Sequence, residues 1–225
     1  MIEIFTSQAF GIMLALFLYI LGGTLYRLTK LPLFNPLLFS SSLLMLYIHF
    51  TKIEITSFLT DLSGINVFMG PLIVSLAIPI AKQRELIKKN LVPILVGTTI
   101  GSLMSILETL LIGHLLGLDD TMIASLVPKS TTTAIAVEIS TRLGGIRAIT
   151  VAVVVLTAVI GSAILPLLIK LFKMKDPRLI GLGLGTTCHA VGTAKALEID
   201  PMAGALSGIA LVISGITTSI ITLFL

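Results

Sequence analysis

Long apolar runs separated by short polar turns dominate the chain. The runs cover residues 9–26, 32–50, 64–81, 91–116, 146–171 and 202–225. A helix needs about 20 apolar residues to cross the hydrocarbon core of a bilayer, and most of these runs are close to that length. Two further stretches, 119–145 and 179–199, are apolar but interrupted. We therefore predict an all-α polytopic membrane protein with about seven or eight hydrophobic segments in a single integral membrane domain, residues 1–225.

Composition supports a membrane protein and removes several other classes. Hydrophobic residues make up 56% of the chain and charged residues only 12%, whereas a soluble domain carries about 25% charged residues. The net charge of +4 is better explained by cytoplasmic loops than by binding to nucleic acid. One cysteine and three histidines predict no metal site, and no enzyme motif or cofactor fingerprint is present. We expect neither an enzyme nor a cofactor-binding protein.

A hydroxyl-rich break at residues 127–145 interrupts the apolar pattern. Pro128 cannot continue a helix without losing a backbone hydrogen bond, and Ser130 is a favoured N-cap residue. The pattern predicts a new helix from Thr131 that ends at Gly144 or Gly145. Within a membrane, such a helix start with Lys129 beside it would attract a small anion such as a carboxylate. A surface loop with Lys129 reaching the lipid headgroups explains the same residues equally well.

Charge distribution decides how the 119–145 segment runs. If every apolar segment crosses once, the basic loops at 82–89 and 170–178 fall on opposite sides of the membrane. That arrangement violates the positive-inside bias, which concentrates Lys and Arg in cytoplasmic loops. The conflict disappears if 119–145 enters and leaves on the same side. We therefore predict a discontinuous or re-entrant segment there, with both basic loops cytoplasmic.

A second polar group lies in the interrupted segment 179–199. Gly192 is expected to break the helix and Thr193 to cap a new one, with Lys195 in its first turn and Glu198 three residues later. Lys195 and Glu198 could serve the anion site, or pair with each other at the membrane surface. A histidine side chain ordinarily titrates near neutral pH, so His189 is either a proton carrier or a histidine hydrogen-bonded between helices.

The candidate site residues fall into two sets. The expected anion-binding set is Lys129, Ser130, Thr131, Thr132, Thr133, Gly192, Thr193 and Lys195. The candidate proton relay is His189, Glu138 and Glu198, with Glu138 expected to face the same cavity as Lys129. Neither set contains a catalytic or metal-ligating residue.

Repeated features suggest how the helices pack. An interrupted segment followed by a plain span occurs at 61–116, 119–171 and 179–225, which raises the suspicion of internal repeats. Four glycine pairs have the spacing that lets helices approach closely, namely Gly97/Gly101, Gly113/Gly117, Gly181/Gly185 and Gly204/Gly208. They indicate tight internal packing, or for one of them a face that forms a homo-oligomer.

Three motifs together resemble the LrgB/CidB family. They are PKSTTTAIAVEIS at 128–140, LGGI at 143–146 and HAVGTAKALE at 189–198, and the stretch 70–79 before the basic loop is similar as well. The resemblance covers essentially the whole chain and implies a bacterial inner-membrane protein with a small hydrophobic LrgA/CidA-type partner. Basic residues at Lys129 and Lys195 fit the family pattern, whereas Ala134 departs from the proline that many relatives have after the hydroxyl run.

The resemblance implies two descriptions of function. One is transport of small monocarboxylates such as pyruvate or glycolate, and the other is holin/antiholin-like control of murein hydrolase export and cell lysis. Two broken helices, each with a cation and a helix start, favour a transporter or channel for small monocarboxylates. Lysis control by a wide pore would need a long amphipathic pore-lining helix, and the chain offers none.

Overall fold

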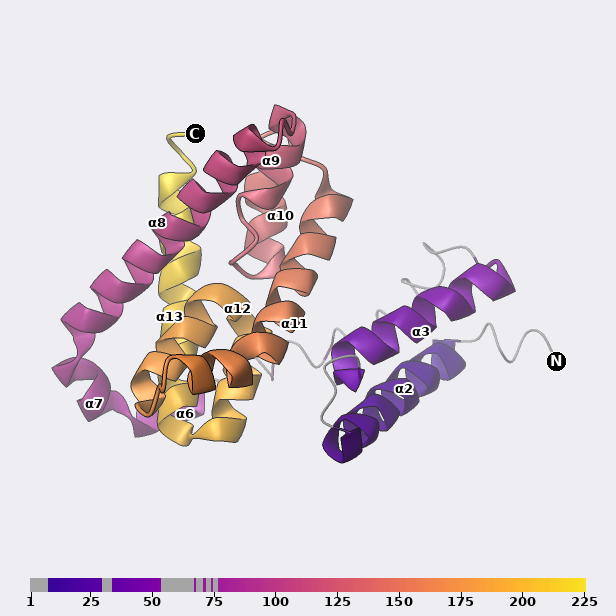
Figure 1. Cartoon of the computed structure of the whole chain (residues 1–225), viewed down its shortest axis with the longest axis horizontal. Coiled ribbons are helices and arrows are strands. Elements are labelled where there is room, and N and C mark those ends of the chain that lie inside the picture. The colour runs from indigo at the N-terminus through magenta and orange to yellow at the C-terminus, as the bar shows by residue number, and fades with distance from the viewer. Residues whose placement is uncertain (1–7, 30–33, 54–66, 68–70, 72–73, 75–76) are drawn as a thin grey trace. The chain divides into compact units, whose positions relative to one another are not determined.

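A computed structural model describes residues 8–29, 34–53, 67, 71, 74 and 77–225, and these residues are almost all helical (Figure 1). Contacts divide the chain into two compact units, residues 1–75 and 76–225. The predicted all-α class is confirmed. Among these described residues, four helices are long and apolar enough to cross a membrane, so the total of seven or eight segments stays a prediction.

The first unit contains a pair of packed apolar helices. Helix α2 (Gln8–Thr29) matches the first predicted span, and α3 (Pro36–Thr51) begins at a proline, which is preorganised for a first helical turn. A Cβ added to Gly22 would lie 3.0 Å from the ring of Phe39, so this glycine lets the two helices approach. The expected segments at 51–61 and 64–81 lie largely outside the described residues.

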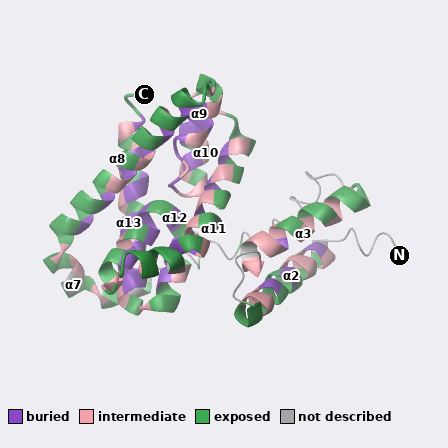
Figure 2. Ribbon diagram, viewed as in Figure 1, coloured by how far each residue is buried: buried purple, intermediate pink, exposed green. Residues whose placement is uncertain are grey.

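The second unit contains the remaining elements. They are α6 (Ala77–Lys82), α7 (Arg84–Lys89), α8 (Leu91–Leu115), α9 (Asp120–Leu126), α10 (Thr133–Arg142), α11 (Arg147–Leu171), α12 (Pro177–Ile199) and α13 (Pro201–Ile221). Helices α8, α11 and α13 each provide a membrane-length apolar stretch. Figure 2 shows that burial concentrates on α12 and α13, while α8 turns much of its surface outward.

Helices α8 and α13 cross in the middle of this unit (Figure 1). One stripe of α8 is buried, at spacings of three and four residues, and consists of Ile94, Thr98, Ser102, Ile106, Thr109 and Gly113. At the crossing, the hydroxyl of Ser102 lies 2.9 Å from that of Ser214 on α13. Both helices begin at the end of the unit that holds α6 and α7, and both finish near α9. They form the frame on which the interrupted segments pack.

Helices α9 and α10 form a re-entrant hairpin, called here the first hairpin (residues 120–142). Asp119 caps α9 by accepting the backbone N–H of Met122 at 2.7 Å. After α10 the chain returns to the last turn of α9, where Ser125 Oγ accepts the N–H of Ile146 at 2.7 Å. A Cβ on Gly145 would lie 2.8 Å from the nitrogen of Ser125, so only glycine fits this return point. The predicted discontinuity at 119–145 is confirmed, and its entry and exit on one side of the membrane stay a prediction.

The tip of the first hairpin reaches the middle of α8. Ser130 Oγ lies 2.8 Å from Ser105 Oγ. Ser105 stands ten residues before Leu115 at the end of α8, which corresponds to about 15 Å along the helix axis. That distance is about half the thickness of a hydrocarbon core. The hairpin tip therefore lies near mid-depth, provided that α8 crosses the membrane as its length predicts.

Helix α12 is itself a hairpin, called here the second hairpin, because its backbone reverses at His189. His189 has φ 41° and ψ −131°, a conformation far from helical. A Cβ on Gly192 would lie 3.0 Å from the carbonyl carbon of Leu184, although eight residues of straight helix would separate them by about 12 Å. The break is therefore at His189, not at Gly192 as predicted. Gly192 is instead where the returning half passes close to the first half.

The second hairpin enters from the end opposite to the first. Its first half runs alongside α13 in the same direction, since Gly181 faces Ala203 and Gly185 faces Ser207. Its second half runs back, because Leu197 packs against Gly204 near the start of α13. A hairpin followed by a span thus occurs twice, at 120–171 and 177–221, in opposite orientations. This geometry supports an inverted internal repeat for the second and third of the three suspected units.

Both basic loops lie at the same end of the second unit. Ile80, next to the 82–89 loop, packs against α13, because a Cβ on Gly208 would lie 3.3 Å from its side chain. Met174, in the other loop, packs on the cluster that contains Ile180 and Ala203. In this loop, Arg178 binds the carboxylate of Asp176 at 2.6 Å and holds the pKa of that carboxyl below its usual value. The shared location agrees with the predicted sidedness.

The members of the four glycine pairs differ in how closely they are packed. A Cβ on Gly181 or Gly185 would meet the backbone of α13, at 2.8 Å from Ala203 Cα and 2.7 Å from Ser207 Cα respectively. This pair provides the expected tight internal packing. A Cβ on Gly97 or Gly117 would meet nothing within 4 Å among the described residues. Gly97 and Gly117 are therefore not packing contacts within this unit.

Candidate functional site

Lys129 lies at the tip of the first hairpin and reaches across to α8. Its ammonium group donates hydrogen bonds to the hydroxyl of Thr109 and, at 3.3 Å, to the carbonyl of Ser105. Both partners are neutral. Glu108 on the exposed face of α8 is close enough to attract Lys129, but among the described residues no carboxylate forms an ion pair with it. The half-buried cation therefore keeps much of its capacity to attract an anion.

Helix α10 begins two residues later than predicted. Thr132 is its N-cap residue and Thr133 is its first residue. Ser130 does not cap the helix, because its hydroxyl is paired with Ser105 on α8. Thr131 instead closes a turn, with its hydroxyl donating to the carbonyl of Pro128 at 3.0 Å. The hydrogen bond between Ser130 and Ser105 therefore explains why α10 does not start at Thr131.

The late start leaves a polar helix end near mid-depth. The side chain of Thr132 makes no capping hydrogen bond, and the first backbone bond of the helix runs from Ala136 to the carbonyl of Thr132 at 2.8 Å. The N–H groups of the preceding turn have no partner within a helix. Thr132 and Thr133 are half-buried and Ala134 is exposed. The predicted combination of a cation, hydroxyl groups and a helix start is present at this tip.

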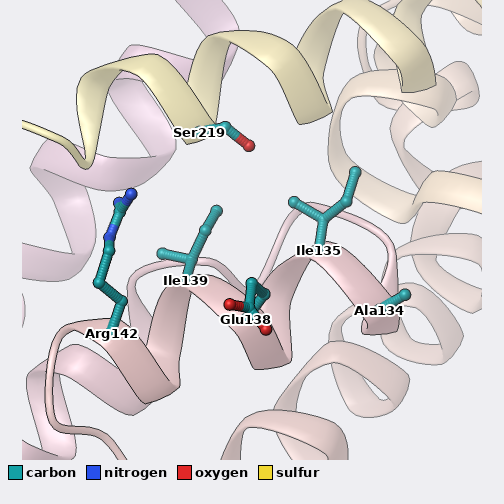
Figure 3. A pocket seen from close by; sticks show the side chains of 6 residues that line it. All are labelled: Ala134, Ile135, Glu138, Ile139, Arg142 and Ser219. Atoms are coloured by element: carbon teal, nitrogen blue, oxygen red, sulfur yellow. The ribbon is translucent and has the colours of Figure 1, made fainter.

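A groove of about 480 Å³ runs between α10 and α13 (Figure 3). Its lining consists of Ala134, Ile135, Glu138, Ile139, Arg142 and Ser219. Arg142 also donates to Thr222 of α13 at 3.0 Å. Glu138 opens onto this groove, and Lys129 is not part of the lining. The expectation that Glu138 and Lys129 share one cavity is therefore wrong, because Lys129 lies before the start of α10 and turns toward α8.

His189 forms a hydrogen bond between helices. Its side chain is buried, and Nε2 lies 3.1 Å from the carbonyl oxygen of Val154 on α11. A carbonyl only accepts, so Nε2 carries the proton in this arrangement. The neighbouring Thr193 donates to the carbonyl of His189 at 3.0 Å and lies 3.0 Å from the hydroxyl of Ser207. The interhelical interpretation of His189 is confirmed, and its role as a proton carrier stays a prediction.

Lys195 and Glu198 pair with each other. Their charged atoms are 2.7 Å apart, and the Glu198 side chain is 67% exposed. The ion pair between Lys195 and Glu198, one of the two predicted alternatives, is therefore the one that the structure contains. Thr193 does not cap a helix as predicted, since its hydroxyl bonds back to His189 and across to α13. Gly192 and Thr193 thus serve the packing of the second hairpin.

The two hairpin tips converge on the crossing of α8 and α13. On α13, Ile135 of the first hairpin lies 2.9 Å from the position of a Cβ on Gly215, and Ser214 beside it donates to the carbonyl of Thr186 in the second hairpin at 3.3 Å. On α8, a Cβ on Gly101 would lie 3.0 Å from the side chain of Thr186, one turn from Ser105. The Lys129 site therefore stands beside the reversal of the second hairpin.

The hydroxyl residues on the framing helices α8 and α13 were not among the predicted site residues. Ser105 and Thr109 hold Lys129, and with the buried Thr98 and Ser102 they form a hydroxyl stripe along α8 in which Ser105 is half-buried. A similar stripe on α13 contains Ser207, Ser214, Thr218 and Thr222. Their helical spacing is visible in the sequence and predicts one polar face on each helix. That signal could have identified the crossing as a polar seam.

Comparison with known proteins identifies the family. The model of the LrgB-like family matches residues 15–225. The chain belongs to the LrgB-like family. Relatives named "Antiholin-like protein LrgB" from Bacillus cereus (strain B4264) and Bacillus anthracis (strain A0248) are each 34% identical over 213 residues, covering 94% of this chain and 93% of the relative. No solved structure matches the chain. This LrgB-type chain is thus a multi-pass bacterial membrane protein, as its apolar helices and its relatives both indicate.

Proposed function

We propose that this LrgB-type protein is a membrane transporter for small monocarboxylates of the pyruvate or glycolate class. The observation that carries the proposal is Lys129, a cation near mid-depth whose partners in the second unit are a neutral hydroxyl and a carbonyl. A charge at the centre of a bilayer costs at least about 2.5 kcal/mol, so such residues are functional candidates. A carboxylate bound to Lys129 and to the N-terminal turn of α10 would balance this charge.

The two hairpins support transport over simple binding. Broken helices that enter from opposite ends and meet at mid-depth are the arrangement by which many transporters expose one site to each side in turn. The inverted order of hairpin and span at 120–171 and 177–221 fits this scheme. Small substrates fit better than large ones, because Ser130, Thr131 and Ser105 around the tip are mostly buried.

The positions of the other predicted residues decide which of them remain candidates for binding the substrate or carrying a proton. Lys195 is engaged by Glu198 in an exposed ion pair, so we assign it to the stability of the second hairpin, not to the substrate. Glu138 faces the groove along α10, and Glu198 is exposed. Among the three candidates for a proton relay, His189 alone is buried next to the converging tips. A proton carried during transport would therefore use His189.

A second function is favoured by the names of the relatives. Proteins that are 34% identical over nearly the whole chain are named antiholin-like, which describes control of cell lysis. Such a role would involve a small LrgA/CidA-type membrane partner. The two functions are compatible, because moving a weak acid across the membrane changes the cytoplasmic pH and can influence lysis indirectly.

Uptake by proteoliposomes tests the proposal. Labelled pyruvate, lactate, glycolate and acetate would be offered to the purified protein, alone and with its small partner. We expect uptake that Lys129→Ala abolishes and Lys195→Ala leaves largely unchanged. Both variants remove one lysine, but only Lys129 contacts the frame at mid-depth. Full uptake by Lys129→Ala would refute the anion site, and leakage of large solutes without carboxylate uptake would favour a lysis-controlling pore.

A further inference from the structure

Buried oxygen atoms cluster where α8, α12 and α13 meet. Ser102 Oγ lies 2.9 Å from Ser214 Oγ and 2.9 Å from the carbonyl oxygen of Thr98. Ser214 Oγ lies 3.3 Å from the carbonyl oxygen of Thr186. All four residues are buried, with exposed fractions between 0% and 6%. These atoms, together with the hydroxyl of Thr98, are called here the oxygen cluster.

The oxygen cluster has more acceptors than protons. Its three short contacts join two carbonyl oxygens and two hydroxyl oxygens, and only Ser102 and Ser214 contribute protons to them. Each hydroxyl has one proton, so the two protons can make two of the three contacts at any moment. Two oxygen atoms are then held at hydrogen-bond distance with no proton between them. Lone pairs that no proton occupies can coordinate a cation.

Thr98 supplies a further unsatisfied oxygen. Its hydroxyl is fully buried and has no hydrogen-bond partner among the described residues. Buried hydroxyl groups almost always find a partner, because leaving one unpaired is unfavourable. Thr98 lies one turn before Ser102 on the same buried face of α8, which packs against α13. The unpaired group therefore points to a ligand in this part of the protein.

The field of the second hairpin also favours a cation here. Thr186 lies in the last turn before the reversal at His189, and the final carbonyls of a helix carry its negative dipole end. The first hairpin instead presents the positive, N-terminal end of α10 together with Lys129. The two features contact α8 about one turn apart, at Thr98 and Ser102 for the cluster and at Ser105 and Thr109 for Lys129. A cation bound at the oxygen cluster and a carboxylate bound at Lys129 would thus lie next to each other.

We propose that the oxygen cluster binds a sodium ion. Hydroxyl and carbonyl oxygens are hard ligands, and carbonyls at the ends of broken helices coordinate Na⁺ in other transporters. The absence of carboxylates from the cluster disfavours divalent cations, which require balancing negative charge. A carboxylate on Lys129 would remove the repulsion between that lysine and the ion. Each ligand would then strengthen the binding of the other, and this coupling, unlike sodium binding itself, rests on the proposed function.

Sodium binding can be measured without transport. Thermal unfolding of the purified protein would be compared in NaCl, KCl and choline chloride at equal ionic strength. At sodium concentrations about a hundredfold above its dissociation constant, we expect the midpoint to rise by about 5 °C or more. Choline should cause no rise, and potassium a smaller one. Equal midpoints in all three salts would overturn the proposal.

Adjacent threonines provide matched variants. Thr98→Val removes the unpaired hydroxyl and should leave stability in choline unchanged or higher, while weakening the response to sodium about tenfold. Thr99→Val is the control, since Thr99 is exposed and its hydroxyl faces Thr217 at 3.5 Å. It should keep the full response. Ser214→Ala provides a second test, because it removes a different ligand of the cluster. A full sodium response in both Thr98→Val and Ser214→Ala would overturn the proposal.

Uptake separates this inference from the proposed function. Carboxylate uptake driven by a sodium gradient, and lost in Thr98→Val, supports both. A sodium-dependent rise in stability without any carboxylate uptake would support the cation site and refute the transport function. Uptake that ignores sodium, together with no effect of sodium on stability, would keep the transport function and refute the cation site.

Discussion

Gly185 provides the sharpest test of the second hairpin. Substitution by alanine would place a methyl group 2.7 Å from the Cα atom of Ser207, where carbon atoms normally stay about 3.5–4.0 Å apart. The obstacle is the backbone of α13, which no rotamer change can move aside. The hairpin would have to separate from α13 by about 1 Å, and Ser207 would lose its good geometry with Thr193.

The expected magnitude follows from opposing effects. Overpacking a tight contact costs about 1–3 kcal/mol, while replacing glycine by alanine within a helix contributes about 0.5–1 kcal/mol of stability. Gly185→Ala should therefore destabilise the protein by about 1–2 kcal/mol, or about 2–8 °C in unfolding midpoint. Gly183→Ala is the control on the same helix, because its methyl group would meet nothing within 4 Å. It should be neutral or raise the midpoint slightly.

The chain carries its own probe for this measurement. Cys188 is the only cysteine, and it is 2% exposed at the turn of the second hairpin, while the chain has no tryptophan. A dye that fluoresces on reaction with thiols therefore reports the opening of the hairpin directly in detergent. If Gly185→Ala and Gly183→Ala unfold at the same temperature, the backbone contact between α12 and α13 is wrong. The reversal at His189 would then need revision too, because it brings the hairpin onto α13.

Three further outcomes are expected. His189→Ala should be less stable than His189→Gly by about 1 kcal/mol in the same thermal assay, because glycine accepts φ 41° without strain and both variants lose the bond to Val154; equal stability would argue against the positive φ. In a Cys188→Ala background, the variants Lys88→Cys and Lys175→Cys should be labelled by an impermeant reagent from the same side of the membrane, and labelling from opposite sides would show that 119–145 crosses. Thr150→Val should lower stability by about 1–2 kcal/mol, since the Thr150 hydroxyl contacts Ser140 at 2.6 Å and the carbonyl of Ser125 at 3.0 Å, and an unchanged midpoint would mean that these buried groups find other partners.

Features that depend on long stretches of sequence could be predicted. The apolar lengths of α2, α8, α11 and α13 identify membrane spans, because burying such a length in lipid outweighs local preferences. The discontinuity of 119–145 was inferred from two basic loops that the positive-inside bias places on one side, and the structure shows two separate helices there. Both inferences rest on sums over many residues, so a single misplaced residue does not change them.

Features that depend on one distant contact could not be predicted. Ser130 has the chemistry of an N-cap residue, but its hydroxyl is bound by Ser105, which is 25 residues away, and the helix starts at Thr133. The reversal was expected at Gly192, since glycine tolerates unusual backbone angles. It occurs at His189, where the bond to Val154 and the packing of Gly192 against Leu184 compensate for the strain.

Helix α13 contacts α12 and α8 through different kinds of groups, and this difference determines which of the two helices can shift relative to it. Against α12, the contact is backbone on backbone at Gly181 and Gly185, a fit that tolerates almost no displacement. Against α8, the contact is made by hydroxyl groups, and those of α8 recur at about one-turn intervals as Thr98, Ser102, Ser105 and Thr109. A partner such as Ser214 could leave one hydroxyl group of α8 and bind the next one after a shift of about 5 Å along the helix, as in one-turn shifts between packed helices. We expect α12 and α13 to move together as one rigid body along α8.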